Sequence, residues 1–471
     1  MKKTTPFTAR KHAEPVRSPL LRRHTRILLI TAAILCLFGS WDMAVARDLG
    51  TVLLEVEKKA PDLLAAAEAV NAEKANIKVE KSRYFGEVDA LARNSNNKDN
   101  RLINPISYPA ALQPDLFDDN QFGYGLTAKV PLDINGKIRA RLEAARQLKA
   151  AVDAGMGNVR LQLLHTAAAL YHDIEGTLAD EEARQRQIDA LQTHIRTTEA
   201  AIEAQQAIPV KKMRLVTERE DVKGRLAALK GREKQLRAAL ASLMAARTFP
   251  DTLSPIHIPP KKLAWQETLI DQRPDITAEK ARLAAAESSV RAAVAERLPQ
   301  MDVDGSWLRN QGYNGEGDDN WTISVHLGLP LWDGGGRRAQ VEKSGAEVRV
   351  RQQKLAALRY RARAQYIAAL ADWDAAVARF KAAVAAEKAA RETERIQANR
   401  FNEGLITADD LVSSEAALAR ARSGKAIALT DWWKAGDKIQ RALGHEPELY
   451  PGKQANHPLA VQAETTEGSG R

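Results

Sequence analysis

The residue types that most often carry chemistry are few in this chain and poorly spaced for catalysis. The only cysteine is Cys36. His165 and His172 are seven residues apart, whereas a two-histidine metal pair on one helix needs a spacing of four. No zinc motif, Ser/His/Asp order or pair of catalytic carboxylates stands out. We therefore expect no catalytic residue, no metal site and no cofactor.

Three consecutive glycines stand before a long helical stretch and could cradle a phosphate. They lack the Lys-Ser/Thr of a nucleotide loop, so we interpret them as a turn from strand to helix, where bulky side chains would clash. A proline precedes the turn, at a strand end where a ladder donor can be lost. The residues of this turn and of its counterpart in the first half are Pro131, Gly136, Pro330, Gly334, Gly335 and Gly336.

Four short segments alternate between apolar and polar residues, which is the period of a strand with one apolar face. The clearest are 122–131 and 321–330; the others are 84–92 and 301–307. We expect two hairpins, connected by residues 94–120 and 308–320. After Ala46, no segment of the sequence is apolar enough for a membrane-spanning helix. If the chain spans a membrane, it must do so with strands of several copies closed into a barrel.

Long helices account for most of the remaining sequence. From about 336 to 402 only Gly345 interrupts a helical pattern, which would give a rod of roughly 100 Å. Apolar residues recur at steps of seven, or of three and four, as in coiled coils. These residues are Ile188, Ile195, Ile202, Leu215, Val222, Leu229, Leu236, Leu243, Leu370, Trp373, Val377, Phe380 and Val384. Two antiparallel rods in each half follow from this spacing.

The first 46 residues have the pattern of a secretory leader, with a basic start, an apolar run and Ala44-Val45-Ala46 as a cleavage site. Removing its eight basic and two acidic residues from the 70 and 60 of the full chain leaves 62 and 58, a net charge of +4 instead of +10. Basic and acidic residues alternate along the helices, which argues against nucleic acid as a partner.

The fold class that these patterns predict is mainly α with a small β part, built from two structural repeats. The first repeat covers 47–247, with a hairpin at 84–131 and long helices at 136–207 and 209–246. The second covers 271–446, with a hairpin at 299–331 and helices at 336–402 and 407–443. A linker at 248–270 joins the repeats, and a flexible tail is expected over 447–471.

Several short motifs, in this order, resemble those of the TolC-like outer-membrane efflux family over nearly the whole mature chain. The motifs are Arg273-Pro-Asp-Ile276, the turns at Pro131 and Pro330, Arg400-Phe-Asn-Glu-Gly404 and Ala442-Leu-Gly444. The resemblance implies a homotrimer in the outer membrane of a Gram-negative bacterium, with a 12-stranded barrel and a periplasmic helical tunnel. It also implies a passive exit duct whose partners are outer-membrane lipid, a periplasmic adaptor and an inner-membrane pump, and the Arg273 motif favours a pump of the resistance-nodulation-division type.

The same resemblance indicates a gate at the second helix tip, where the family has a ring of aspartates after the tip glycine. Thr407 and Asp410 fall on matching positions, while Ser413 replaces the second aspartate and Ile406 replaces a basic residue. The competing interpretation is that Asp409 and Asp410 favour the start of a helix after a Thr407 N-cap.

The tips are also candidate contacts for the adaptor, through Gly404 in the second half and Lys211, Lys212 and Arg214 in the first. The competing interpretation of these three cations is solvated surface charge. For the whole chain, the alternative to an export channel is a secreted coiled-coil structural or adhesin-like protein. An enzyme comes third, since no constellation supports it.

Overall fold

The computed structural model describes residues 47–96, 120–249, 252–256, 260–264, 267–312 and 317–448. The predicted leader with Cys36 and nearly all of the predicted tail lie outside these residues. The chain divides into two units, and the described part of the smaller one is Arg47 with residues 252–254, joined by a parallel bridge between Arg47 and Leu253. The elements below all belong to the larger unit.

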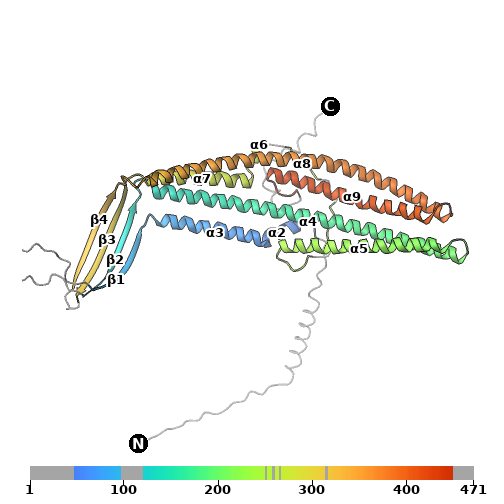
Figure 1. The fold of residues 1–471 in the computed structure, drawn as a ribbon, viewed down its shortest axis with the longest axis horizontal. Helices are drawn as coiled ribbons and strands as arrows, with labels where there is room; N and C mark the ends of the chain where they lie inside the picture. The colour runs from blue at the N-terminus through green and yellow to red at the C-terminus, as the bar shows by residue number, and fades with distance from the viewer. Residues whose placement is uncertain are drawn as a thin grey trace, which may run out of the picture. The chain divides into compact units, whose positions relative to one another are not determined.

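Two very long helices, each of 67 residues, dominate the larger unit (Figure 1). They are α4 (Lys137–Glu203) and α8 (Gly336–Asn402), each about 100 Å long at 1.5 Å per residue. The shorter helices are α2 (Leu49–Lys59), α3 (Pro61–Ser82), α5 (Pro209–Leu243), α6 (Glu267–Ile270), α7 (Pro274–Ala295) and α9 (Ala408–Leu443). The sequence predicted α4 to run to residue 207, but it ends four residues earlier.

The helices form a layer in which α4 and α8 run the full length and shorter helices fill the places beside them. Near the sheet, α3 packs on α4, α4 on α7, and α7 on α8. Beyond the midpoint, α5 and α9 pack on α4, and α9 packs on α8 (Figure 1). Helices α7 and α9 therefore both pack between α4 and α8, α7 in the half near the sheet and α9 in the half near the tips.

Four antiparallel strands form one sheet in the order β1-β2-β3-β4: β1 (Glu87–Asn96), β2 (Asn120–Leu132), β3 (Gln300–Gly312) and β4 (Gly317–Gly328). The predicted start of the first strand at Tyr84 was wrong. Gly86 has a positive φ of 68°, so the chain turns there before β1 begins. The predicted end of the third strand at Trp307 was also wrong, because pairing with β4 continues to Gln311.

The two faces of the sheet differ sharply in polarity. Direct partners such as Leu126 and Trp307, or Val303 and Val325, share one face, which is apolar. On β4 this face is uncovered: Trp321 is 71% exposed and Leu327 is 68% exposed. None of the described helices combines the length and apolarity needed to cross a membrane.

The coiled-coil spacing predicts the buried residues of the first half better than those of the second. Leu215 and Val222 are fully buried, and Ile188 and Ile195 are buried as well. In α8 only Trp373 of the five predicted members is fully part of the core, while Leu370 and Val377 are partly buried and pack against it, and Val384 is exposed. The buried seam of α8 consists of Ala362, Tyr366, Ala369, Trp373 and Ala376. Alanine at these positions allows α8 to lie close to its neighbours, and apolar spacing alone does not reveal this.

Arg273 connects α7 and α9, the two helices that pack between α4 and α8. Its side chain is buried, donates to the carbonyl oxygen of Ala442 at the end of α9, and reaches Gln365 on α8 at 3.2 Å. It also forms a double contact with Asp275 in the first turn of α7, at 2.8 and 3.1 Å. Gly444 has a φ of 81°, and a Cβ there would lie 2.8 Å from the Arg273 side chain.

We expect Arg273→Ala to lower the free energy of unfolding by about 2–3 kcal/mol, because it leaves a buried carbonyl and a carboxylate without their charged donor. Urea titration in detergent, followed by helical circular dichroism, measures the change. The matched control is Arg338→Ala, whose side chain is 81% exposed and pairs with Glu342 on the surface. Equal effects of the two substitutions would contradict the role of Arg273.

Candidate functional site: helix tips and strand-to-helix turns

The second-half tip is a Schellman turn that requires a glycine. Gly404 has a φ of 75°, its N–H donates to the carbonyl of Phe401, and the N–H of Leu405 donates to the carbonyl of Arg400 at 2.8 Å. A side chain at Gly404 would be strained in this left-handed conformation. The predicted tip glycine therefore fixes the reversal from α8 to α9.

Thr407 and Asp410 form a capping box at the start of α9. The Thr407 hydroxyl accepts from the N–H of Asp410 at 3.2 Å, and the Asp410 carboxylate accepts from the Thr407 N–H at 3.0 Å and from its hydroxyl at 2.7 Å. These hydrogen bonds lower the pKa of Asp410. Asp410 and Ser413 are both exposed and lie three residues apart on one face of α9.

The first-half tip makes the same turn without a glycine. Gln205 has a φ of 62°, its N–H donates to the carbonyl of Ile202, and the N–H of Gln206 donates to the carbonyl of Ala201 at 2.8 Å. A non-glycine residue in this conformation costs about 1–2 kcal/mol. Sequence reasoning missed Gln205, because only a glycine or asparagine would have marked the position.

The three basic residues of the first tip have partners within the chain. Lys212 pairs with Glu199 at 2.9 Å, and Arg214 pairs with Asp409 at the start of α9. Lys211 lies over the ring of Phe401, 5.8 Å from its centroid. Because both ion pairs are well exposed, each contributes little to stability and can exchange partners. The Arg214–Asp409 pair connects the tips of the two halves.

Beneath the tips, an apolar cluster joins the four helices that meet there. Its members are Ile188, Leu191, Ile195, Leu215, Val222, Leu226, Phe401, Ala408 and Leu411, and Ile406 packs against it. His194 lies beside this cluster, 3.4 Å from Glu415. Burial, together with the neighbouring Glu415, raises the pKa of Glu394 on α8. Sequence reasoning missed the polar group of His194, Glu394 and Glu415, because these residues come from three different helices.

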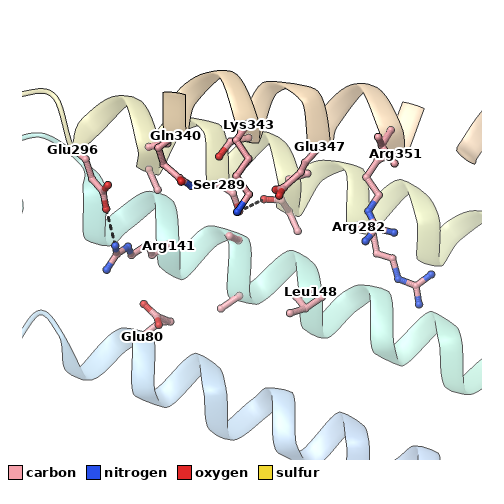
Figure 2. A pocket seen from close by; sticks show the side chains of 18 of the residues that line it. Glu80, Arg141, Leu148, Arg282, Ser289, Glu296, Gln340, Lys343, Glu347 and Arg351 are labelled. Carbon is pink, nitrogen blue, oxygen red and sulfur yellow. Dashed lines mark hydrogen bonds and ion pairs between the residues drawn. The ribbon is translucent and has the colours of Figure 1, made fainter. Parts of the chain in front are cut away.

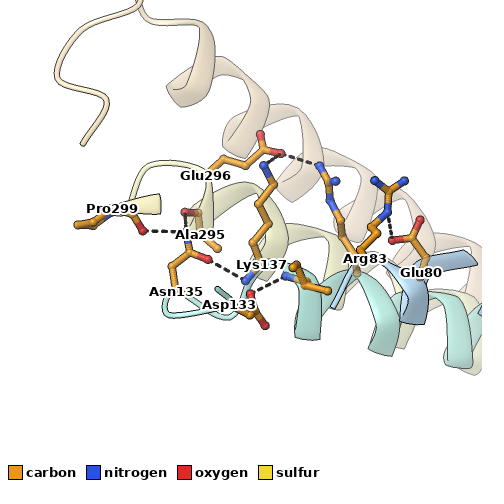
Figure 3. A network of polar contacts seen from close by, with 10 residues as sticks. Glu80, Arg83, Asp133, Asn135, Lys137, Ala295, Glu296 and Pro299 are labelled. Atoms are coloured by element: carbon orange, nitrogen blue, oxygen red, sulfur yellow. Dashed lines mark hydrogen bonds and ion pairs between the residues drawn. The ribbon is translucent and has the colours of Figure 1, made fainter. Parts of the chain in front are cut away.

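The first strand-to-helix turn is held by Asp133 and Asn135 (Figure 3). Gly136 has a φ of 76° and precedes α4, and the Asp133 carboxylate accepts from the N–H groups of Ile138 and Arg139, each at 2.8 Å. The Asn135 amide donates to the carbonyls of Ala295 and Pro299, at 3.1 and 3.0 Å. This turn of the first half is therefore fixed to the end of α7 in the second.

The second turn uses the same device. Gly334 and Gly335 have φ values of 70° and 92°, and the Asp333 carboxylate accepts from the N–H of Gly335 at 3.1 Å and of Arg337 at 2.8 Å. The hydrogen bond from Arg337 lowers the pKa of Asp333. Pro131 is the penultimate residue of β2, and Pro330 lies two residues beyond β4. The sequence pattern singled out the glycines and prolines but missed both capping aspartates.

A groove of about 960 Å³ runs between α3, α4, α7 and α8, close to the sheet (Figure 2). Much of its floor consists of small residues of α4 and α7, such as Ala145, Ala286 and Ser289. Charged side chains surround them, among them Arg141, which donates to Glu296 at 2.8 Å. The mixed charge and the small residues suit a smooth polar wall better than a specific pocket.

His165 and His172, which the sequence excluded as a metal pair, lie near the boundary of α4 and α9. Nε2 of His165 lies 2.8 Å from the carbonyl oxygen of His445, to which it donates. His172 is fully buried, and its ring nitrogens lie 3.4 Å from carboxylate oxygens of Glu175 and Asp437. Burial lowers the pKa of His172, but the two carboxylates outweigh this effect and raise it.

A small antiparallel sheet with an uncovered apolar face, joined to two long antiparallel helical hairpins, defines a TolC-like channel fold. The sequence matches the outer membrane efflux protein family over residues 52–205 and 265–445. The chain therefore belongs to the outer membrane efflux protein family.

Two curated relatives align at low identity. Nodulation protein T of Rhizobium leguminosarum bv. trifolii is 25% identical over 180 residues, which is 37% of this chain and 38% of that protein. The pyoverdine export outer membrane protein OpmQ of Pseudomonas aeruginosa is 24% identical over 320 residues, or 64% of this chain and 65% of that protein. The chain thus aligns with less than two thirds of the length of either relative.

Solved structures share the fold over most of the chain. CusC superposes with a TM-score of 0.74 and 16% identity, covering 85% of this chain and 93% of that one. The outer membrane protein VceC of Vibrio cholerae superposes with a TM-score of 0.71 and 20% identity, covering 85% and 97%. At these identities the likeness shows the fold.

We expect Glu394→Gln to raise the Tm of the detergent-solubilised protein at pH 7. The pKa of Glu394 is raised in the folded state, so its ionised form disfavours folding and a neutral amide does not carry that cost. The gain should vanish below the ordinary glutamate pKa of about 4.3, where wild-type Glu394 is itself protonated. The control is Glu392→Gln, because Arg395 lowers the pKa of Glu392. A gain at pH 7 in Glu392→Gln as large as in Glu394→Gln would contradict this account.

Proposed function

We propose that the protein is a passive exit duct in the outer membrane, through which a tripartite system expels small molecules. The observation that carries this proposal is the sheet, which has an uncovered apolar face and an open edge strand on each side. Residues 1–46 would act as the export leader, and the two repeats over 47–247 and 271–446 would place their hairpins in the membrane. Membership of the efflux family and the channel fold support this assignment.

Four strands are too few to close a membrane barrel, since such barrels need at least eight. In a homotrimer, β4 of one copy would pair with β1 of the next, which gives 12 strands. The apolar faces would then contact outer-membrane lipid, where a charged side chain is costly. The helical layers of the three copies would surround a tunnel in the periplasm, with the groove of Figure 2 as part of its wall.

We further propose that Asp410, with Thr407 and Ser413, narrows the tunnel at its periplasmic end. Three copies of an ionised carboxylate around one axis attract cations and repel one another. Within one copy, the hydrogen bonds with Thr407 lower the pKa of Asp410, which favours the ionised form.

Two substitutions at Asp410 separate its charge from its capping role. Asp410→Gln removes the charge but keeps an acceptor for the capping box, while Asp410→Ala removes both. We expect both to change single-channel conductance and cation selectivity in a planar bilayer, and only Asp410→Ala to lower stability, by about 1 kcal/mol. A change of conductance in Asp410→Ala alone would mean that capping, and not charge, is responsible. Absence of conductance in the wild type and in both variants would contradict the duct itself.

The tips around Gly404 would dock on a periplasmic adaptor, which in turn contacts an inner-membrane pump, in our proposal one of the resistance-nodulation-division type. Lys211, Lys212 and Arg214 would meet an acidic adaptor surface, exchanging their weak intrachain pairs for contacts with the partner.

Exchanging the partners of one pair tests this docking surface. Arg214→Asp combined with Asp409→Arg restores the intrachain pair but reverses the charge at each position. We expect this double variant to lose at most about 1 kcal/mol of stability, because a basic residue replaces Asp409 in the first turn of α9. We expect it to lose export when it is expressed with its native adaptor and pump. The control is the equivalent exchange of Arg186 and Glu182, an exposed pair on α4 away from the tip. Normal export by the tip variant would contradict adaptor docking through Arg214.

A further inference from the structure

Three side chains with metal-ligand chemistry converge on the polar face of the sheet. Asp302 and Asp304 lie two residues apart on β3, and His326 on β4 is the direct partner of Asp302. One ligand atom from each lies within 4.8 Å of the others. Nδ1 of His326 is 2.5 Å from an oxygen of Asp304 and 3.6 Å from one of Asp302.

The sheet explains why these groups meet. Residues two apart on a strand point to the same face, and direct partners on neighbouring strands share that face. The register of β3 and β4 therefore holds all three Cα positions in place without a loop. Donors on paired strands are positioned more accurately than donors on loops, which favours a defined coordination geometry.

We propose that Asp302, Asp304 and His326 bind a divalent transition-metal cation such as Zn²⁺. Ligand atoms at about 2.0–2.2 Å from a tetrahedral Zn²⁺ lie about 3.5 Å apart, a separation that the two His326 contacts bracket. An imidazole favours Zn²⁺, Cu²⁺ or Ni²⁺ over Mg²⁺ and Ca²⁺, which prefer oxygen ligands alone. Three protein ligands leave a coordination position open to water or to an exported ligand.

On the strands themselves, the polar face beside the cluster carries more acidic than basic residues. Glu87 and Asp89 on β1 belong to the same polar face, because they pair with Lys129 and Thr127 of β2. Asp302 also lines a cavity of about 610 Å³ at the junction of the sheet and the helices, so solvent ions reach it. This end of the polar face has four carboxylates and Lys129, while Arg83, Lys137 and Arg141 line the helix side of the same cavity.

Lys129 would compete with a metal ion for the two aspartates. Its Nζ lies 3.5 Å from Asp302 and 3.9 Å from Asp304, and its side chain is half exposed. If the cluster were only a network of polar contacts, Lys129 and His326 would be enough to satisfy the two aspartates, and no metal would bind. If the three groups form a metal site, Lys129 must move aside, and its charge weakens binding. The effect of removing Lys129 therefore separates the two possibilities.

The test is to measure the affinity for Zn²⁺ by isothermal titration calorimetry, with ZnCl₂ as the only titrant. The full chain is extracted from membranes in detergent, purified without a histidine tag and freed of metal with EDTA. We expect one Zn²⁺ per chain in the wild type. His326→Ala should weaken binding by at least about tenfold, since even loss of a ligand's supporting partner costs about 10–100-fold. Lys129→Met should strengthen it several-fold. The control is Asp318→Asn, an exposed acid at the far end of β4, which should change nothing.

Circular dichroism on each variant establishes that the fold is retained. Absence of Zn²⁺ binding to the wild type at millimolar metal would overturn the proposal. So would equal affinity in the wild type and in His326→Ala, which would place the ion elsewhere. An unchanged affinity in Lys129→Met would likewise overturn it. The metal site does not depend on the duct function, since the titration needs no channel activity.

Discussion

The structure depends on how the two 67-residue helices are kept apart along their length. A single shorter helix cannot fill the space between α4 and α8, so α7 and α9 fill it in succession. Arg273 lies at their junction, where it caps the end of α9 and pairs with Asp275 in the first turn of α7. Without this contact, two helix ends would meet inside the layer with unsatisfied backbone groups. The sheet and the tips are thus coupled through one continuous layer.

A layer with this arrangement is incomplete at its edges. The sheet ends in two open edge strands, β1 and β4, and its apolar face is uncovered on β4. Soluble proteins usually protect such edges, because they pair readily with other chains. In the proposed trimer, further copies would pair with the open edges and lipid would cover the apolar face. The capping aspartates Asp133 and Asp333 would then matter for function, because they set where α4 and α8 begin after the strands.

Local patterns revealed most of the architecture, because strands, long helices and glycine turns each leave a short-range signal. The apolar residues spaced seven apart correctly predicted that Leu215 and Val222 are buried. Tertiary pairing left no such signal, so the alanine seam of α8 around Ala369 was missed. Gln205 was missed because its left-handed conformation is imposed by the hairpin and not by its own preference. The metal-ligand cluster at His326 needed the register of two strands, which an alternating pattern does not provide.

The most direct test of the account is cross-linking between copies. Cys36 is the only cysteine and lies in the predicted leader, so new cysteines on β1 near Ala90 and on β4 near Ile323 report contacts without background. Within one chain these edge strands are separated by two others, about 14 Å at 4.8 Å per strand, which is too far for a disulfide. The account predicts that oxidation in outer membranes gives a ladder that ends at a trimer. Monomers alone at every pair of positions scanned would contradict it.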